Sequence, residues 1–166
     1  VTGSYDRIVS VGMGEHVGRE NFGSFLKLVS ARLKPGGRFV CHMMACYDGV
    51  LMYSGDERWT SFASVTMPNG DVSSMTQVTQ AALQTGDLRV IHTETYGIHY
   101  ARTGEAWLRN IQANREKIIR AYSEEFYRVY EYSWQMGSAA FETGMTLLHV
   151  VFEKQPYGSS YRESIL

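Results

Sequence analysis

The sequence lacks several features that would place it in a specialised class of protein. Its 166 residues include only two cysteines and three prolines. No apolar run approaches the roughly 20 residues that a membrane-spanning helix needs. Cys41 and Cys46 are too few for a disulfide framework, and their spacing does not match a zinc site. We expect both to be reduced, as in a cytoplasmic protein, with a surface disulfide between them as the alternative.

An excess of charge of one sign is also missing. Sixteen basic and 17 acidic residues give a net charge of −1, and no basic stripe runs along the chain. This balance argues against a nucleic-acid partner. The five histidines follow no metal-ligand spacing, so we expect no metal site. A hydrophobic fraction of 44% is ordinary for one globular domain with its own core.

A glycine-rich nucleotide motif is absent as well. Neither GxGxxG nor GxGxG occurs, and the nearest match, Gly12-Met13-Gly14, is weak evidence by itself. The chain begins with VTGSYDR, without an initiator Met, and enters a strand almost at once. We therefore expect a piece of a longer protein, in which the phosphate- or amino-acid-holding part of any nucleotide site lies before Val1.

The first third of the chain has the pattern of a strand–helix–strand unit. Residues 6–12 indicate a strand buried on both faces, and residues 22–33 repeat apolar side chains at helical spacing. KPGG at 34–37 ends the helix, and RFVCHMM at 38–44 forms the next strand. The unit predicts two parallel strands with a right-handed crossover. Residues 45–72 show no period and indicate a lid or binding loop.

Capping residues mark the next helix. Ser74 and Gln77 fit a capping box, so we expect a helix that runs to about Thr85 and is closed by Gly86. The segment LRVIHTETY, residues 88–96, then has the composition of a strand.

The pattern of the last third of the chain predicts helices followed by a strand. From Thr103 the pattern is helical for nearly forty residues, with a break at Tyr122-Ser123. MTLLHVVFEK, at residues 145–154, is the final strand. These elements predict one α/β domain over residues 1–154 and a frayed tail over 155–166.

An aromatic stripe runs along the second helical segment. Its spacing is i, i+4, i+8, i+11 and i+15. This spacing favours a buried core face, with an apolar tunnel for an acyl chain as the second interpretation. The stripe consists of Phe126, Tyr130, Trp134, Gly137 and Phe141.

Polar side chains follow the first two strands. Ligands of such sheets bind at the carboxyl ends of the strands. Glu15 and His16 come just after the first strand, and His42 lies near the end of the second. We interpret His16 as a structural residue that holds the loop. His92, His99 and His149 carry no functional signal in the sequence.

Six sequence blocks resemble, in order, the C-terminal half of the cyclopropane-fatty-acyl-phospholipid synthase and mycolic acid cyclopropane synthase family. They are YDRIVSVGMGEHVG, LKPGGRFVCHMM, TMPNGDVSS, YGIHYARTGEAWLRNI, YSEEFYRVYEYSWQMGSAAF and LLHVVFEK, and they cover residues 5–154. LKPGG alone indicates only a class I methyltransferase, whereas EHVG together with HYARTGEAW narrows the resemblance to this family. It implies the C-terminal half of a Rossmann-like class I fold: a parallel sheet with a final antiparallel strand and an α-helical insertion.

The resemblance also implies an activity. Members of the family transfer a methyl group from S-adenosylmethionine (SAM) to a cis double bond of a phospholipid acyl chain. A bound bicarbonate then takes a proton, and a cyclopropane ring closes. Matched block by block, the catalytic residues are Glu15, His42 and Tyr100, and the backbone amide of Met44 joins them around the bicarbonate.

Other positions follow from the same resemblance. Val11 and Gly12 fall at the SAM site. A cysteine of the family's glycine-rich SAM motif has no counterpart here, and neither Cys41 nor Cys46 takes its role. The family usually has a bulky residue where Gly14 stands and a different sequence at His42-Met43-Met44. We expect these changes to widen the pocket and to shift the choice of substrate.

Two rival functions stay open at this stage. One is a related SAM-dependent C- or N-methyltransferase that acts on another lipid or a small molecule. The other is a non-catalytic lipid-binding fragment. We further expect peripheral contact with a membrane, and either a homodimer through the unpaired edge of the sheet or a missing N-terminal half that covers this edge.

Overall fold

A computed structural model describes residues 2–48 and 70–156 of the chain. The elements are β1 (Tyr5–Val11), α1 (Gly14–Val17), α2 (Arg19–Arg32), β2 (Leu33–Cys46), β3 (Ser73–Ser74), α4 (Met75–Leu83), β4 (Leu88–Thr95), α5 (Gly97–Ala113), α6 (Arg115–Ala121), α7 (Glu124–Thr143) and β5 (Met145–Lys154). Most of the predicted lid or binding loop and most of the predicted tail lie outside the described residues.

The strands form one mixed sheet in the order β1-β2-β5-β4, with β3 beside the end of β2. β1 and β2 are parallel, which confirms the parallel pairing expected of the strand–helix–strand unit. β5 runs antiparallel to both β2 and β4, as the resemblance implied for the final strand. Consequently β1 and β2 end at the same edge of the sheet.

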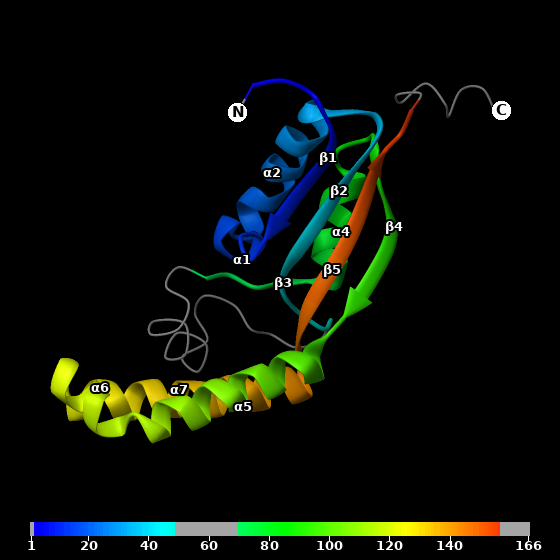
Figure 1. The fold of residues 1–166 in the computed structure, drawn as a ribbon. Helices are drawn as coiled ribbons and strands as arrows, with labels where there is room; N and C mark the ends of the chain where they lie inside the picture. The colour runs from blue at the N-terminus through cyan, green and yellow to red at the C-terminus, as the bar shows by residue number, and fades with distance from the viewer. Residues whose placement is uncertain (1, 49–69, 157–166) are drawn as a thin grey trace.

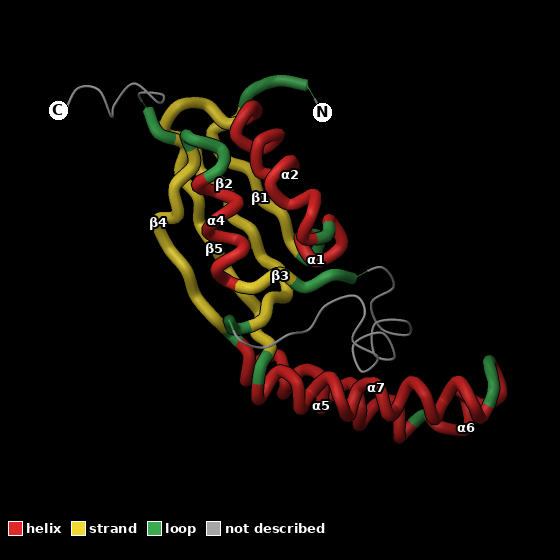
Figure 2. The backbone as a smooth tube through the Cα atoms, turned by 180° about the vertical axis from the view of Figure 1, so that it is seen from behind, coloured by secondary structure: helices red, strands yellow, loops and turns green. Residues whose placement is uncertain are grey.

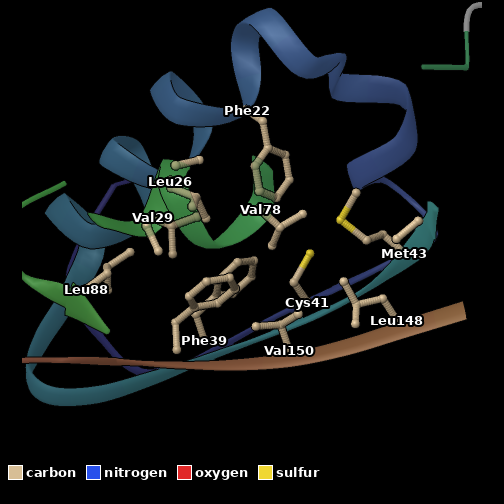
Figure 3. Close-up of a cluster of buried hydrophobic side chains, with 14 of the residues drawn as sticks. Phe22, Leu26, Val29, Phe39, Cys41, Met43, Val78, Leu88, Leu148 and Val150 are labelled. Atoms are coloured by element: carbon tan, nitrogen blue, oxygen red, sulfur yellow. The ribbon is translucent and has the colours of Figure 1, made fainter. Parts of the chain in front are cut away.

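One face of the sheet carries the main core. Helices α2 and α4 cover this face, behind the sheet in Figure 1 and in front of it in Figure 2. Phe22 and Leu26 of α2 meet Phe39 and Cys41 of β2 there, and all four are at most 2% exposed (Figure 3). Phe39 also stacks on Phe152 of β5, with ring centroids 5.6 Å apart.

The opposite face of β1 is open, so the prediction of a strand buried on both faces is wrong. Val9 and Val11 are 65% and 66% exposed, whereas Ser10 on the covered face is buried. β1 is an edge strand of the described sheet, and α2 and α4 lie only on its other side. The strand is apolar, as predicted, but none of the described segments covers these two valines.

The capping box that the sequence predicted is present. The Gln77 backbone N–H donates to Ser74 Oγ at 3.2 Å, and the Ser74 N–H donates to Gln77 Oε1 at 2.8 Å. The helix ends at Leu83, and Gly86 follows with a φ of 82°. Both ends of α4 therefore agree with the sequence signals to within two residues.

Helices α5, α6 and α7 form an arm that projects from one end of the sheet (Figure 1). The predicted break before Ser123 is confirmed, since Ser123 Oγ accepts the Phe126 N–H at 3.0 Å. A further break at Asn114 was not predicted. The arm begins at Gly97, six residues before the predicted start at Thr103.

The aromatic stripe on α7 is buried over its second half only. Trp134, Gly137 and Phe141 are buried, as predicted for a core face. Phe126 is 37% exposed, and Tyr127 is buried in its place. No helix among the described residues is long and apolar enough to cross a membrane.

Candidate functional site

The candidate site lies where β1 ends beside β2, which continues to Cys46. Val11 is the register partner of His42, and the Gly12 N–H donates to the His42 carbonyl at 2.9 Å. Gly12 then turns the chain with a φ of 62°, a conformation that suits glycine. This turn leads at once into α1, which carries Glu15.

Glu15 is a buried carboxylate with one oxygen left open. Glu15 is only 3% exposed, and its Oε2 has no hydrogen-bond partner among the described residues. The Glu15 carbonyl accepts the Asp71 N–H at 2.8 Å, and the Asp71 carboxylate forms an ion pair with Arg19 at 2.8 Å. A buried polar oxygen without a partner is costly, so this position suits a bound group that can donate a hydrogen bond.

Tyr100 reaches the same region from α5. Its ring lies 4.5 Å from that of Phe141 and 6.0 Å from that of Trp107. Burial raises the pKa of the Tyr100 phenol, and the Glu15 carboxylate raises it further. The two groups are therefore within electrostatic reach of each other, and the phenol keeps its proton at neutral pH. It can donate a hydrogen bond to an anion.

His42 and Met44 lie on one face of β2. His42 is half-buried, and its Nδ1 has no hydrogen-bond partner within the described ranges. Met44 packs in the same small cluster as Tyr100. Backbone groups two residues apart in a strand point the same way. The Met44 amide therefore points, like the His42 carbonyl, to the side on which β1 ends.

The structure thus gathers most of the predicted site residues. It places Glu15 within electrostatic reach of Tyr100, and it packs Met44 against the cluster that holds Tyr100. His42 lies two residues before Met44 on the same face, beside the end of β1.

The two residues assigned to SAM lie at the open end of β1. Val11 is 66% exposed, and no atom of the described residues stands within 4 Å of the point where a Cβ on Gly12 would lie. This end of the strand has room for a ligand. His16 has an exposed side chain, and only its backbone N–H, which donates to the Met13 carbonyl at 2.9 Å, closes the α1 turn.

Gly14 does not widen the pocket, contrary to the expectation from the sequence. A Cβ at Gly14 would stand 2.7 Å from Met43 Sδ and 3.0 Å from Met43 Cβ. Met43 is fully buried on the face covered by α2. The methionine therefore fills the space that the glycine leaves, and the two departures from the family pattern compensate for each other.

The cysteines are two buried free thiols, so the alternative of a surface disulfide is wrong. Cys41 packs in the main core, whereas Cys46 packs in the cluster with Met44 on the other side of the sheet. Burial, with a smaller contribution from Glu15, raises the pKa of Cys41 to about 12. Neither thiol is placed to act as a nucleophile or a ligand.

Sequence reasoning missed two groups at this site. The Arg19–Asp71 pair ties α2 to the segment that also holds Glu15 in place. The ring of His149 lies 4.8 Å from that of His42. Both contacts join segments far apart in the chain, and the local sequence carries no signal for either of them.

Known proteins match the chain over nearly its whole length. The family described as mycolic acid cyclopropane synthetase matches residues 1–151. The cyclopropane-fatty-acyl-phospholipid synthase of Escherichia coli strain K12 is 32% identical over 151 residues, which cover 90% of this chain and 38% of that protein. The sphingolipid C9-methyltransferase A of Emericella nidulans is 32% identical over 133 residues, which cover 80% of this chain and 25% of that protein. The chain spans less than half the length of these curated relatives.

Solved structures show the same fold. The cyclopropane synthase MmaA2 of Mycobacterium tuberculosis superposes with a TM-score of 0.80 at 23% identity, over 93% of this chain and 57% of that one. The apo form of the mycolic acid cyclopropane synthase CmaA1 has a TM-score of 0.74 at 26% identity, over 93% of this chain and 60% of that one. These neighbours share the α/β fold of class I SAM-dependent methyltransferases. The chain therefore belongs to the mycolic acid cyclopropane synthetase family.

Proposed function

We propose that this chain supplies the proton-handling side of the active site of a SAM-dependent methyltransferase. Its substrate is a cis double bond in a phospholipid acyl chain, which it converts into a cyclopropane ring. The observation that carries the proposal is the buried Glu15 carboxylate, with one oxygen open, beside the protonated phenol of Tyr100. When bound, SAM supplies the methyl group, and a bicarbonate-type anion accepts the proton that the methylated chain loses.

The described residues fit a small anion that carries a proton of its own. Tyr100 and the Met44 amide are donors, and an imidazole N–H of His42 is a third. Glu15 accepts the hydrogen bond of the anion's hydroxyl or orients His42, because a carboxylate that faced the anion's charge directly would repel it. Since the donors hold the anion and no side chain serves as the base, no side chain competes to be methylated.

The surroundings of Tyr100 suit a positively charged intermediate. Phe141 and Trp107 both contact the Tyr100 ring, and Phe141 is buried. Aromatic faces stabilise a nearby cation, and a dry apolar cavity keeps water from trapping it. The arm formed by α5 and α7 therefore contributes apolar walls as well as the Tyr100 phenol, while α1 and β2 contribute the other polar groups.

The proposed SAM site lies at the end of β1. Val11 and Gly12 would hold the cofactor at the open end of this strand, where Gly12 leaves free space. A backbone without a side chain allows a ligand to approach closely. The solved structure of CmaA1 in complex with SAH and CTAB, at 24% identity and with the same fold, supports a SAM-type cofactor.

Methyl transfer without ring closure is the second candidate. The sphingolipid C9-methyltransferase of Emericella nidulans is as similar to this chain, at 32% identity, as the Escherichia coli synthase is. The two candidates predict different products. Ring closure removes the double bond of the acyl chain, whereas the alternative keeps it. Vesicles of a cis-unsaturated phospholipid, labelled SAM and a test of the product for remaining double bonds distinguish them.

The experiment that tests the proposal compares Glu15→Gln with Glu20→Gln. Glu20 lies on the first turn of α2 with an exposed side chain, so it provides the same chemical change outside the site. In a protein of the relatives' full length, we expect Glu15→Gln to abolish turnover and to leave SAM affinity, measured by calorimetry, nearly unchanged. We expect Glu20→Gln to alter neither.

Two results would overturn the proposal. Equal losses of turnover and SAM affinity in Glu15→Gln would make Glu15 a structural residue. Absence of methyl transfer by the unaltered protein on unsaturated lipid vesicles would favour a non-catalytic lipid-binding role. Calorimetry on this chain alone then shows whether it contains enough of the SAM site to bind the cofactor.

A further inference from the structure

Three neighbouring strands place polar side chains at one level on the open face of the sheet. His42 of β2 is the register partner of His149 of β5, and His149 is in turn the partner of Glu94 of β4. Register partners lie on the same face of a sheet. That face is opposite the one covered by α2 and α4, where Cys41 and Met43 pack.

The ring of His149 has aromatic contacts with two neighbours. It lies 4.8 Å from the His42 ring and 4.8 Å from the Tyr96 ring, at interplanar angles of 45° and 49°. These separations are typical of favourable pairs of aromatic rings. His149 therefore connects His42, which lies on β2 beside the end of β1, to Tyr96, which precedes the helical arm.

Tyr96 is itself fixed at both ends. Its backbone N–H donates to the Leu147 carbonyl at 2.8 Å, and its hydroxyl donates to a Glu94 carboxylate oxygen. The other Glu94 oxygen lies 3.2 Å from His92 Nε2. Because the tyrosine is anchored through its backbone and its hydroxyl, its ring gives His149 a firm surface to pack against.

We propose that His149 is a positioning residue that holds the His42 imidazole in a single orientation by ring contact, with Tyr96 and Glu94 holding His149. The inference rests on the proposed function, in which His42 helps to bind the anion. A histidine on an open sheet face can rotate about its terminal torsion, which is broad for this residue type. Small errors in the placement of a binding group lower catalytic rates strongly.

The electrostatics agree with a packing role. Burial lowers the pKa of His149, its electrostatic interaction with His42 lowers it further, and Glu94 opposes the shift. His149 is therefore uncharged at neutral pH. It presents a flat, neutral aromatic ring to His42.

The test compares two substitutions of His149 that separate its ring from its nitrogen atoms. His149→Phe keeps a ring and loses the nitrogens, whereas His149→Ala loses both. We expect His149→Ala to lower kcat by about tenfold or more, because His42 is no longer held, with KM for SAM within about threefold. We expect His149→Phe to retain kcat within about threefold of the unaltered enzyme.

Val151→Ala provides the matched control. Val151 is two residues along β5, half-buried on the same face, with Val40 as its register partner. We expect this variant to keep kcat while losing a similar amount of packing. A His149→Ala enzyme that matches the Val151→Ala enzyme would overturn the inference. So would a His149→Phe enzyme that falls as far as His149→Ala, because the nitrogen and not the ring would then matter.

Nuclear magnetic resonance on this chain gives a readout that does not depend on turnover. In the unaltered chain and in His149→Phe, the ring-proton resonances of His42 should be displaced by the neighbouring aromatic ring. In His149→Ala they should move toward the values of a free imidazole. Unchanged His42 resonances in His149→Ala would refute the positioning role. If the unaltered protein shows the displaced His42 resonances but has no activity, the proposed function is refuted and the positioning role of His149 is not.

Discussion

Three buried polar atoms without partners lie in or near the neighbouring strands β1 and β2, on both faces of the sheet. They are Ser10 Oγ, Glu15 Oε2 and His42 Nδ1, and none has a hydrogen-bond partner in the described part of the chain. Such atoms are uncommon in folded proteins because each one costs solvation without compensation. Glu15 and His42 could be identified from sequence blocks. His149 could not, since its contact with His42 depends on which strands become neighbours in the sheet.

The close packing of Gly14 against Met43 contributes to the stability of the fold. We expect Gly14→Ala to lower the free energy of unfolding by about 1–3 kcal/mol, because the new methyl group overlaps a fully buried side chain. Urea titration followed by circular dichroism measures the change. Met43→Val shortens the side chain that the new methyl group meets. The double variant Gly14→Ala/Met43→Val should therefore lose less free energy of unfolding than the sum of the two single variants.

Gly23→Ala is the control for this prediction. Gly23 lies inside α2, and its nearest neighbour, Gln84 Oε1, would be 3.5 Å from the new Cβ. An alanine there should raise the free energy of unfolding by roughly 0.5–1 kcal/mol, since glycine is a poor residue for a helix interior. If Gly14→Ala also stabilised the chain, Met43 would not fill the space that we assign to it.

Elements were predictable where local chemistry alone determines their ends. Ser74 and Gln77 set the start of α4, and Ser123 sets the start of α7, through bonds within a few residues of each cap. α5 begins six residues before its predicted start, because the sequence around Gly97 carries no such capping signal. A Cβ there would stand 2.9 Å from the carbonyl oxygens of Phe141 and Met145, so tertiary packing decides this boundary.

The capping box of α4 can be tested directly. We expect Ser74→Ala to lower the free energy of unfolding by about 1 kcal/mol, because the Gln77 backbone N–H at the helix start loses Ser74 Oγ as its acceptor. Chemical denaturation measures the loss. Ser24→Ala, at an exposed position inside α2, removes the same hydroxyl without a cap and should leave stability within about 0.5 kcal/mol. Equal effects of the two substitutions would contradict the role of the cap.

At the scale of the whole molecule, the open face of β1 is the feature that sequence could not foresee. The apolar run predicted a strand buried on both faces, yet burial requires a covering layer, which is a property of the assembled fold. Val9 and Val11 remain exposed, and the outer edge of β1 has no strand beside it in the described sheet. Exposed apolar strand edges promote association between chains.

We therefore expect this chain to self-associate through β1 in solution. Sedimentation velocity over a range of concentrations should show species larger than one chain, and Val9→Lys should shift them toward the monomer. Tyr132→Lys, on α7 and 60% exposed, replaces an apolar residue far from the sheet edge and should not have this effect. A chain that sediments as a monomer at every concentration would disprove association through β1.

The arm of α5, α6 and α7 leaves the sheet after β4 and returns at β5, which are antiparallel neighbours. Its two ends therefore meet, with Gly97 packed against the carbonyl oxygens of Phe141 and Met145. In topological terms the arm is an insertion into a hairpin, so a change in its length would leave the register of the strands undisturbed. Tyr100 lies in the first turn of α5, where the arm joins the sheet. Changes beyond this turn would therefore alter the apolar surface of the arm and leave Tyr100 in place beside the sheet.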